Sequence, residues 1–320
     1  MKIDKTKTNS IRKAFGKTLA EIGELNEKIV VMDADLACST QTKIFADKFP
    51  DRFFDCGIAE QNMLATAAGL ASEGKIPFVA SFAVFVTGRT YDQIRNGICY
   101  PNFNVKIVGT HGGVTVGEDG ATHQALEDIS LMRGLPHMTV IVPADCKECQ
   151  EAIKYAALHE GPTYIRIPRS NVPDIFDGNY SFNVQKAVVV EEGTDASVFT
   201  NGETLAEVLL AAEELKKDNI SLEVINVPVV KPLDSQTVIE SVKKTKLAIT
   251  VENHSIIGGL GSAICETLSD KLPSKVYRIG VNDEFGQSGT AEELIEHYGL
   301  DSKTLATKIK TMINKGKEQD

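Results

Sequence analysis

The chain alternates short apolar runs with longer amphipathic stretches. Consecutive apolar and often β-branched residues occupy 29–34, 77–82, 104–110, 138–143 and 162–167. Such runs indicate strands that are buried on both faces, as in a parallel sheet. Helical stretches at 10–25, 59–73, 91–99 and 146–159 lie between them, and Ser10 is placed to cap the first. The alternation predicts a doubly wound α/β domain, with helices on both faces of a parallel sheet.

A second series of the same kind follows a segment without period. Ser, Asn, Asp, Pro and Gly collect at 170–183, which is typical of a linker. Strand-like runs then occupy 187–193, 196–202, 222–230, 247–253 and 275–280, with helical stretches at 203–217, 235–244 and 259–272. We predict a first domain over 1–170, a linker over 171–185 and a smaller mixed-sheet α/β domain over 186–320. The polar tail from Lys308 to Asp320 is expected to fray.

Composition and charge exclude several classes of protein. The 320 residues are 42% hydrophobic and 24% charged, without a long uncharged apolar run, so no membrane span is expected. The first residues lack the apolar core of a secretory signal, and we expect a cytoplasmic protein. A net charge of −10 without a basic stripe argues against nucleic acid as a partner.

The six cysteines do not indicate a special site. They are scattered along the chain, which argues against a disulfide framework. Cys146 and Cys149 have the spacing of metal ligands, but no second pair completes a tetrahedral set nearby. We therefore predict no metal site on this chain.

A first candidate for chemistry is the segment 53–74, which runs from a strand through a glycine turn into a helix. It places Glu60 in the first helical turn, where an acid can simply complement the helix dipole. The small residues that follow at 65–71 allow the helix to pack closely on another surface. A carboxyl held in such a dry interface has its charged form disfavoured, which suits proton exchange.

Two further segments add aromatic and polar groups. Phe82 and Phe85 follow a strand, either as core residues or as a wall that stacks on a flat heteroaromatic ring. The segment 109–128 combines His111, Asp119 and His123 with five glycines between a strand and a helix. Glycines let the backbone approach a ligand closely, and these side chains can bind hydroxyls and phosphate, although polar packing also explains such a cluster.

These three segments, in this order, resemble the pyrimidine-binding half of transketolases. The resemblance rests on GIAEQNM at 57–63, the Phe-rich segment and GEDGATHQ at 117–124. In the second domain VKPLD at 230–234, VENHSIIGGLGS at 251–262 and FGQSG at 285–289 extend it over nearly the whole chain. The resemblance implies a thiamine-diphosphate enzyme that transfers a two-carbon ketol unit from a ketose phosphate to an aldose phosphate.

The resemblance assigns residues to the cofactor. Glu60 corresponds to the family's glutamate that bonds N1′ of the aminopyrimidine. Phe82 and Phe85 correspond to aromatics that pack on this ring. Asp35 and Leu36 correspond to residues near the thiazolium ring.

One departure from the family lies in the Phe-rich segment. Where several relatives carry a third aromatic, this chain has Gly88 and then Arg89 and Tyr91. That contact with the cofactor is therefore left without a counterpart.

The resemblance also assigns residues to a sugar phosphate. His111 and His123 correspond to loop histidines with catalytic roles beside Glu60, and Asp119 corresponds to an aspartate that reads a hydroxyl. The phosphate-binding residues of the family correspond to Arg12, Ser39, His111 and Arg169. Two arginines with a serine and a histidine make a multidentate anion site.

Half of the expected site is missing from this chain. The family holds the diphosphate through Mg²⁺ with a GDG segment and a later Asn, and no GDG occurs here. The hard oxygen ligands that Mg²⁺ needs must then come from elsewhere. The resemblance implies an amino-terminal partner subunit and assembly as a dimer of heterodimers.

Three alternatives stay open. The β subunits of 2-oxoacid dehydrogenases have the same two domains but lack the GEDGxTHQ signature. Deoxyxylulose-phosphate synthases share this signature but are single long chains. A non-catalytic paralogue would be expected to have lost Glu60, His111, Asp119 and His123.

Overall fold

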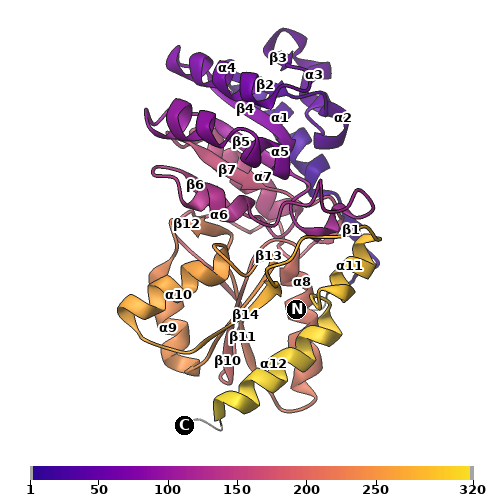
Figure 1. Ribbon diagram of the computed structural model, residues 1–320, viewed down its shortest axis with the longest axis vertical. Helices are drawn as coiled ribbons and strands as arrows, with labels where there is room; N and C mark the ends of the chain where they lie inside the picture. Colours follow the sequence, from indigo (N-terminus) through magenta and orange to yellow (C-terminus); the bar gives the residue numbers. More distant parts are fainter. Residues whose placement is uncertain (1–2, 318–320) are drawn as a thin grey trace.

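The computed structural model describes residues 3–317 as two α/β units that pack against each other (Figure 1). The first sheet has seven strands in the order β12-β6-β7-β5-β4-β2-β3. Their bounds are Val229–Lys231, Thr139–Ile141, Thr163–Arg166, Lys106–Thr110, Ile76–Phe82, Ile29–Asp33 and Phe53–Asp55. Every residue of β2, β4, β5, β6 and β7 is buried, as the apolar runs predict.

Helices cover both faces of this sheet. The larger ones are α1 (Ile11–Leu25), α4 (Glu60–Ser72) and α7 (Cys146–Leu158). Short helices are α2 (Ala37–Thr40), α3 (Lys43–Lys48), α5 (Ala83–Gly88) and α6 (Asp128–Arg133), with 3₁₀ turns at Pro50–Arg52 and Val114–Val116. The Ser10 hydroxyl accepts the Lys13 N–H at 3.3 Å and caps α1, which confirms its predicted role. The stretch 91–99, predicted to be helical, is a π-helix over Gln93–Cys99.

The second sheet is mixed, as predicted. Its strand order is β14-β13-β10-β11-β9, and only β9 runs antiparallel to its neighbour. The strands span Val276–Val281, Ala248–Ser255, Ala196–Thr200, Leu222–Asn226 and Val188–Glu191. The helices are α8 (Thr204–Lys216), α9 (Ser235–Thr245), α10 (Leu260–Lys271), α11 (Ala291–His297) and α12 (Ser302–Lys317). No helix between residues 3 and 317 combines the length and apolar character needed to cross a bilayer.

Two expectations about the second unit were wrong. The run 222–230 is not one strand, because β11 ends at Asn226 and β12 leaves to pair antiparallel with β6 of the first sheet. Pro228 lies at the break, where it has no N–H to donate to a strand ladder. The tail does not fray up to Lys317, because Ile309 and Ile313 lie on the buried face of α12; residues 318–320 lie outside the described part.

The linker is tied to both units by two buried acids. Asp145 caps α7, and its second oxygen accepts the N–H groups of Ile175 and Phe176 at 2.8 and 2.7 Å. Glu148 accepts from the Tyr180 hydroxyl at 2.5 Å and from Asn226 Nδ2 of β11 at 2.8 Å. Burial raises the pKa of Glu148 to about 7. A short sheet of β1 (Thr8–Asn9) and β8 (Val172–Pro173) adds a further tie, and the domain limits given above stay a prediction.

Candidate active site

The predicted site residues lie along one edge of the first sheet. Four parallel strands that are neighbours in the sheet, β7, β5, β4 and β2, end at this edge. Arg169 follows β7, His111 follows β5, Phe82 ends β4, and Asp35 follows β2. The crevice at the carboxyl ends of parallel strands is where ligands bind in open α/β sheets. The topology thus brings together residues that are far apart in the sequence.

Four aromatic rings form a cluster at this edge. Phe82 and Phe85 are nearly parallel, with ring centroids 5.7 Å apart and planes 16° apart. His111 stacks on Phe82 at 3.8 Å, and His123 stands edge-on to Phe85 at 5.3 Å. The two phenylalanines and two histidines predicted from separate segments are therefore in mutual contact.

Glu60 begins α4, and its side chain is only 5% exposed. Its Oε1 lies 2.7 Å from Nη1 of Arg89, a residue that follows α5. The Arg89 guanidinium also lies over the Phe85 ring, 3.9 Å from its centroid. The predicted surroundings of Glu60 were a dry interface, and the ion pair with Arg89 was not predicted. Of the small residues on α4, Ala65 and Gly69 are exposed in this chain.

The predicted phosphate-binding residues also converge. Arg12 donates from Nη1 to the Ser39 carbonyl at 2.8 Å and from Nη2 to the Arg169 carbonyl at 3.1 Å. The Arg169 side chain donates to the Val116 carbonyl and pairs with Glu118 at 3.0 Å. Burial and the nearby Arg169 lower the pKa of Arg12. Two guanidinium groups held this close concentrate positive charge, which favours an anion.

His111 is neutral in this setting. The pKa of His111 is lowered to about 3, mainly by burial and to a smaller extent by the positive charges of Arg12 and Arg169. Its Nδ1 lies 2.9 Å from the Thr110 hydroxyl. A neutral imidazole has one N–H to donate and one nitrogen to accept, so His111 can bind a hydroxyl, a carbonyl or a phosphate oxygen.

Asp119 and the loop glycines differ from expectation. Asp119 is exposed and makes no side-chain hydrogen bond within the described chain, so the structure does not bring it onto the two histidines. Gly113, with φ +80°, leaves no room for a side chain, because an added Cβ would lie 2.4 Å from Asn253 Nδ2. At Gly120 the neighbour is the Ser288 hydroxyl, 2.5 Å from such a Cβ. Gly113 and Gly120 therefore let the loop approach the second unit closely.

The turn after β2 is held by a buried acid that the sequence reasoning missed. Asp35 has a left-handed φ of 62°, and the Leu36 N–H is bonded to Asp33 Oδ1 at 2.7 Å. The other Asp33 oxygen accepts the hydroxyls of Thr40 and Thr42 at 2.7 and 2.8 Å. Burial raises the pKa of Asp33. Asp33 therefore fixes the backbone at Leu36, while the Asp35 N–H is bonded to Asp55 Oδ1 at 3.0 Å, so both residues assigned to the thiazolium ring are held by an acid.

Two residues of the second unit hold the histidine loop, the segment 111–127 between β5 and α6 that carries His111 and His123. Asn253 of β13 accepts the Val114 N–H at 3.0 Å through Oδ1 and donates to Glu203 Oε1 at 2.5 Å. Glu203 is partly buried and also accepts the hydroxyls of Thr115 and Ser170 at 2.8 and 2.5 Å. The motif at 251–262 was noted in the sequence, but its role in positioning this loop could not be read from it.

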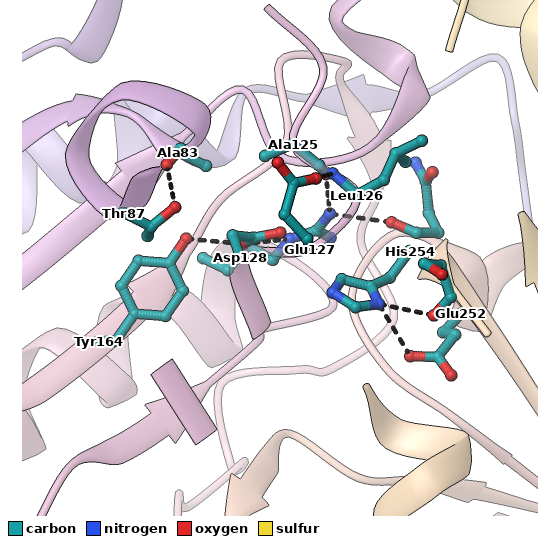
Figure 2. A network of polar contacts seen from close by, with 12 residues as sticks. Ala83, Thr87, Ala125, Leu126, Glu127, Asp128, Tyr164, Glu252 and His254 are labelled. Carbon is teal, nitrogen blue, oxygen red and sulfur yellow. Dashed lines mark hydrogen bonds and ion pairs between the residues drawn. The ribbon is translucent and has the colours of Figure 1, made fainter. Parts of the chain in front are cut away.

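A buried network extends from this point into the first unit. Asp128 accepts from the Tyr164 hydroxyl at 2.7 Å and from Arg166 Nε at 2.8 Å, and Figure 2 shows Tyr164 directed at Asp128. Arg166 also donates to the Asn253 carbonyl at 2.9 Å. In the same view the buried His254 lies beside Glu252, whose carboxylate caps the first turn of α10. The second unit is thus joined to the site by buried polar contacts.

The described residues contain no group of three or more His, Cys, Asp or Glu side chains that could hold a metal ion. Cys146 and Cys149 are free thiols, and Cys149 lies in the core of the first unit. A flat heteroaromatic ring fits the residues present. One planar group, the Arg89 guanidinium, contacts both the Glu60 carboxylate and the face of the Phe85 ring, so a flat ring in the same place would reach both.

Comparison with known proteins gives matches over most of the chain. Residues 7–174 match the family model described as the transketolase pyrimidine-binding domain, and residues 185–305 match that of the transketolase C-terminal domain. A protein of Methanocaldococcus jannaschii, provisionally named as a transketolase C-terminal section, is 47% identical, with 93% of this chain and 95% of that protein covered.

Two further relatives have the same length. The 6-deoxy-6-sulfo-D-fructose transketolase subunit SqwH of a Clostridium species is 41% identical, with 92% of each chain covered. A solved structure described as a split gene transketolase, inactive β4 tetramer, is 46% identical with a TM-score of 0.89 and covers 95% of this chain and 98% of that one.

Proposed function

Because this chain belongs to the transketolase family, we propose that it is the C-terminal subunit of a two-chain, thiamine-diphosphate-dependent transketolase. The reaction is the transfer of a two-carbon ketol unit from a ketose phosphate to an aldose phosphate. The observation that carries the proposal is the convergence of buried Glu60 with the Phe85 ring at the carboxyl edge of a parallel sheet.

Glu60, Phe82 and Phe85 are proposed to hold the aminopyrimidine of the cofactor. When bound, thiamine diphosphate supplies a carbon nucleophile and then stores the electrons of the broken carbon–carbon bond. Glu60 would bond the ring nitrogen and exchange a proton there, while the phenylalanines would stack on the ring and exclude water. Asp35 and Leu36, on the turn held by Asp55 and Asp33, are proposed to lie near the thiazolium ring.

His111, His123 and the two arginines are proposed to bind the sugar. Neutral His111 and the adjacent His123 can donate hydrogen bonds to the carbonyl and hydroxyl oxygens near the reacting carbon. Arg12, Ser39 and Arg169 are proposed to bind the distal phosphate, and Asp119 is proposed to bind a hydroxyl. Phosphate binding far from the reacting bond would hold the ketose in position.

The Mg²⁺ ligands and the diphosphate site are proposed to come from a partner chain. The GDG segment that holds them in the family is absent from this sequence. Phe54 and Ile58, two exposed apolar side chains, flank the turn into α4, and Ala65 and Gly69 are exposed on the helix itself. Exposed apolar groups beside a buried acid support docking of the partner chain at this place. The resulting heterodimer is proposed to self-associate into a dimer of heterodimers.

Reconstitution tests this function. The highly purified chain, with thiamine diphosphate and Mg²⁺, should show no ketol transfer, and activity should appear when the amino-terminal partner is added. Turnover by the chain alone would contradict the two-chain proposal. A stable complex that binds the cofactor but transfers no ketol unit from any ketose phosphate tried would contradict the proposed reaction.

A further inference from the structure

Arg89 makes two contacts that the proposed function assigns to the cofactor. Its Nη1 lies 2.7 Å from Glu60 Oε1, where a ring nitrogen would donate. Its guanidinium lies 3.9 Å from the Phe85 centroid, where a flat ring would stack. Guanidinium is itself planar, delocalised and a hydrogen-bond donor, so it satisfies an acid and an aromatic face in the way that a protonated heteroaromatic ring does.

The Arg89 side chain is free to leave while its backbone stays fixed. Its carbonyl accepts Gln61 Nε2 at 2.8 Å, and its N–H is bonded to the Phe85 carbonyl at 3.2 Å. Beyond the backbone, the side chain is 47% exposed, whereas Glu60 is 5% exposed. A half-exposed arginine side chain can rotate into water at little cost in free energy. The Glu60 carboxylate that it leaves is buried and needs a new hydrogen-bond donor.

We infer that Arg89 is an internal placeholder: it occupies the pyrimidine position in the cofactor-free chain and is displaced when the cofactor binds. The inference rests on the proposed function. Without the cofactor, Arg89 keeps the Glu60 carboxylate paired and covers Phe85, so that the site is not left with a bare buried charge. A ligand that stacks on this face of Phe85 and bonds this oxygen of Glu60 must compete with Arg89, and its apparent affinity falls by the fraction of sites that are covered.

The first test uses the cofactor-free chain and does not depend on the proposed function. Urea unfolding of the wild type, Glu60→Gln, Arg89→Ala and the double variant forms a double-mutant cycle. The pair should appear as non-additivity of about two- to fivefold in the unfolding equilibrium constant, the range of half-exposed ion pairs. Additive effects of the two substitutions would show that the pair does not form, and would overturn the inference.

The second test measures cofactor affinity in the assembled complex with Mg²⁺ by calorimetry. Arg89→Ala should bind thiamine diphosphate about three- to thirty-fold more tightly than the wild type, because an ion pair and a cation–π contact no longer compete. Arg89→Lys keeps the charge but loses the flat stacking, and should lie between the two. Arg95→Ala is the matched control, since Arg95 is an exposed arginine of the same region whose bond goes to Asn96.

The outcomes separate the two proposals. Equal or weaker binding by Arg89→Ala, in a wild-type complex that does bind the cofactor, would overturn the displacement and leave the proposed function intact. A wild-type complex that binds no thiamine diphosphate would overturn the proposed function and the displacement with it, even where the double-mutant cycle shows the Glu60–Arg89 pair.

Discussion

Asn253 of the second unit accepts a hydrogen bond from the backbone N–H of Val114, 3.0 Å away in the loop that follows His111. The conformation of the histidine loop therefore depends on a side chain that lies 139 residues further along the chain. The same amide donates to Glu203, which holds Thr115 and Ser170 by their hydroxyls. The C-terminal unit thus supports the site without contributing a predicted catalytic residue.

Replacing Asn253 tests this support. Asn253→Ala leaves the buried Val114 N–H unpaired and removes one of the two donors to Glu203 Oε1, so we expect the free energy of unfolding to fall by about 1–3 kcal/mol. The loop should also loosen, raising KM for the ketose phosphate. Denaturant unfolding and steady-state kinetics check the two effects. Asn282→Ala, an exposed asparagine of the same unit, should change neither.

Glu60→Gln tests proton exchange at the cofactor. The amide keeps the shape and can donate a hydrogen bond, but it cannot exchange a proton with the ring nitrogen. We expect folding and assembly to survive while hydrogen–deuterium exchange at the thiazolium carbon slows by about 10²- to 10⁴-fold. An unchanged exchange rate in a variant that binds the cofactor would refute the role. If Glu60 only complemented the helix dipole, the substitution would reduce stability by at most about 1 kcal/mol and leave kcat nearly intact.

Arg169 and Glu118 form a matched pair of substitutions for phosphate recognition. Arg169→Ala should raise KM for phosphorylated ketoses by about tenfold or more, since a charge-assisted contact is worth about 1.5–3 kcal/mol. A small unphosphorylated donor should be affected far less. Glu118→Gln removes the exposed carboxylate that pairs with Arg169 at 3.0 Å, and should leave KM for phosphorylated ketoses equal or lower. Equal effects of Arg169→Ala on both donors would show that Arg169 does not touch the phosphate.

Glu148 gives a pH dependence of stability. Its folded pKa of about 7 lies above the ordinary value of 4.5, so the folded chain holds a proton that the unfolded chain releases. Its contribution to stability is full below pH 4.5 and is lost as the pH rises to about 7, with a slope of up to about 1.4 kcal/mol per pH unit. Glu148→Gln should remove this slope.

The measurement is the free energy of unfolding of both proteins from pH 5 to 7. Other groups have shifted pKa values too, including Glu203, whose pKa is also raised by burial. The difference between wild type and Glu148→Gln isolates the one group. Glu151→Gln on the same helix is the control, because the hydrogen bond from Lys147 lowers the pKa of Glu151, whereas that of Glu148 is raised. Parallel curves for wild type and Glu148→Gln would show that Glu148 is ionised in the folded chain at pH 5.

Strands β2, β4, β5, β6 and β7 of the first sheet and β10 of the second were predictable because each is a run of consecutive buried residues. The cap at Ser10 was predictable because its partner Lys13 lies three residues away. The run 222–230 was misjudged for the same reason. Apart from Glu223 and Asn226 it is apolar, and no local feature indicates which sheet its last residues join. The apolar positions Leu305, Ile309 and Ile313, spaced four apart on α12, were a helical signal in the tail that its polar composition concealed.

Some features of the candidate site could likewise be predicted from the sequence, and others could not. Residue types that a flat ring or an anion needs were identifiable, and the sheet edge brings Phe82, Phe85, His111 and His123 together. The Glu60–Arg89 pair joins residues 29 apart, and the Glu203–Asn253 pair joins residues 50 apart. Neither spacing leaves a periodic signal, since each contact depends on how two elements pack. The loop glycines were conspicuous, but whether they face a ligand or a neighbouring unit could only be seen in three dimensions.

Strand β12 has a consequence for synthesis on the ribosome. A chain made from its amino terminus forms β2 to β7 of the first sheet early, but β12 emerges only after β9, β10 and β11 have been made. Until Val229 and Lys231 arrive, β6 is an unpaired edge on a sheet of apolar strands, open to pairing with another nascent chain. The first half is therefore exposed to aggregation for the time that it takes to translate the linker and three strands of the second half.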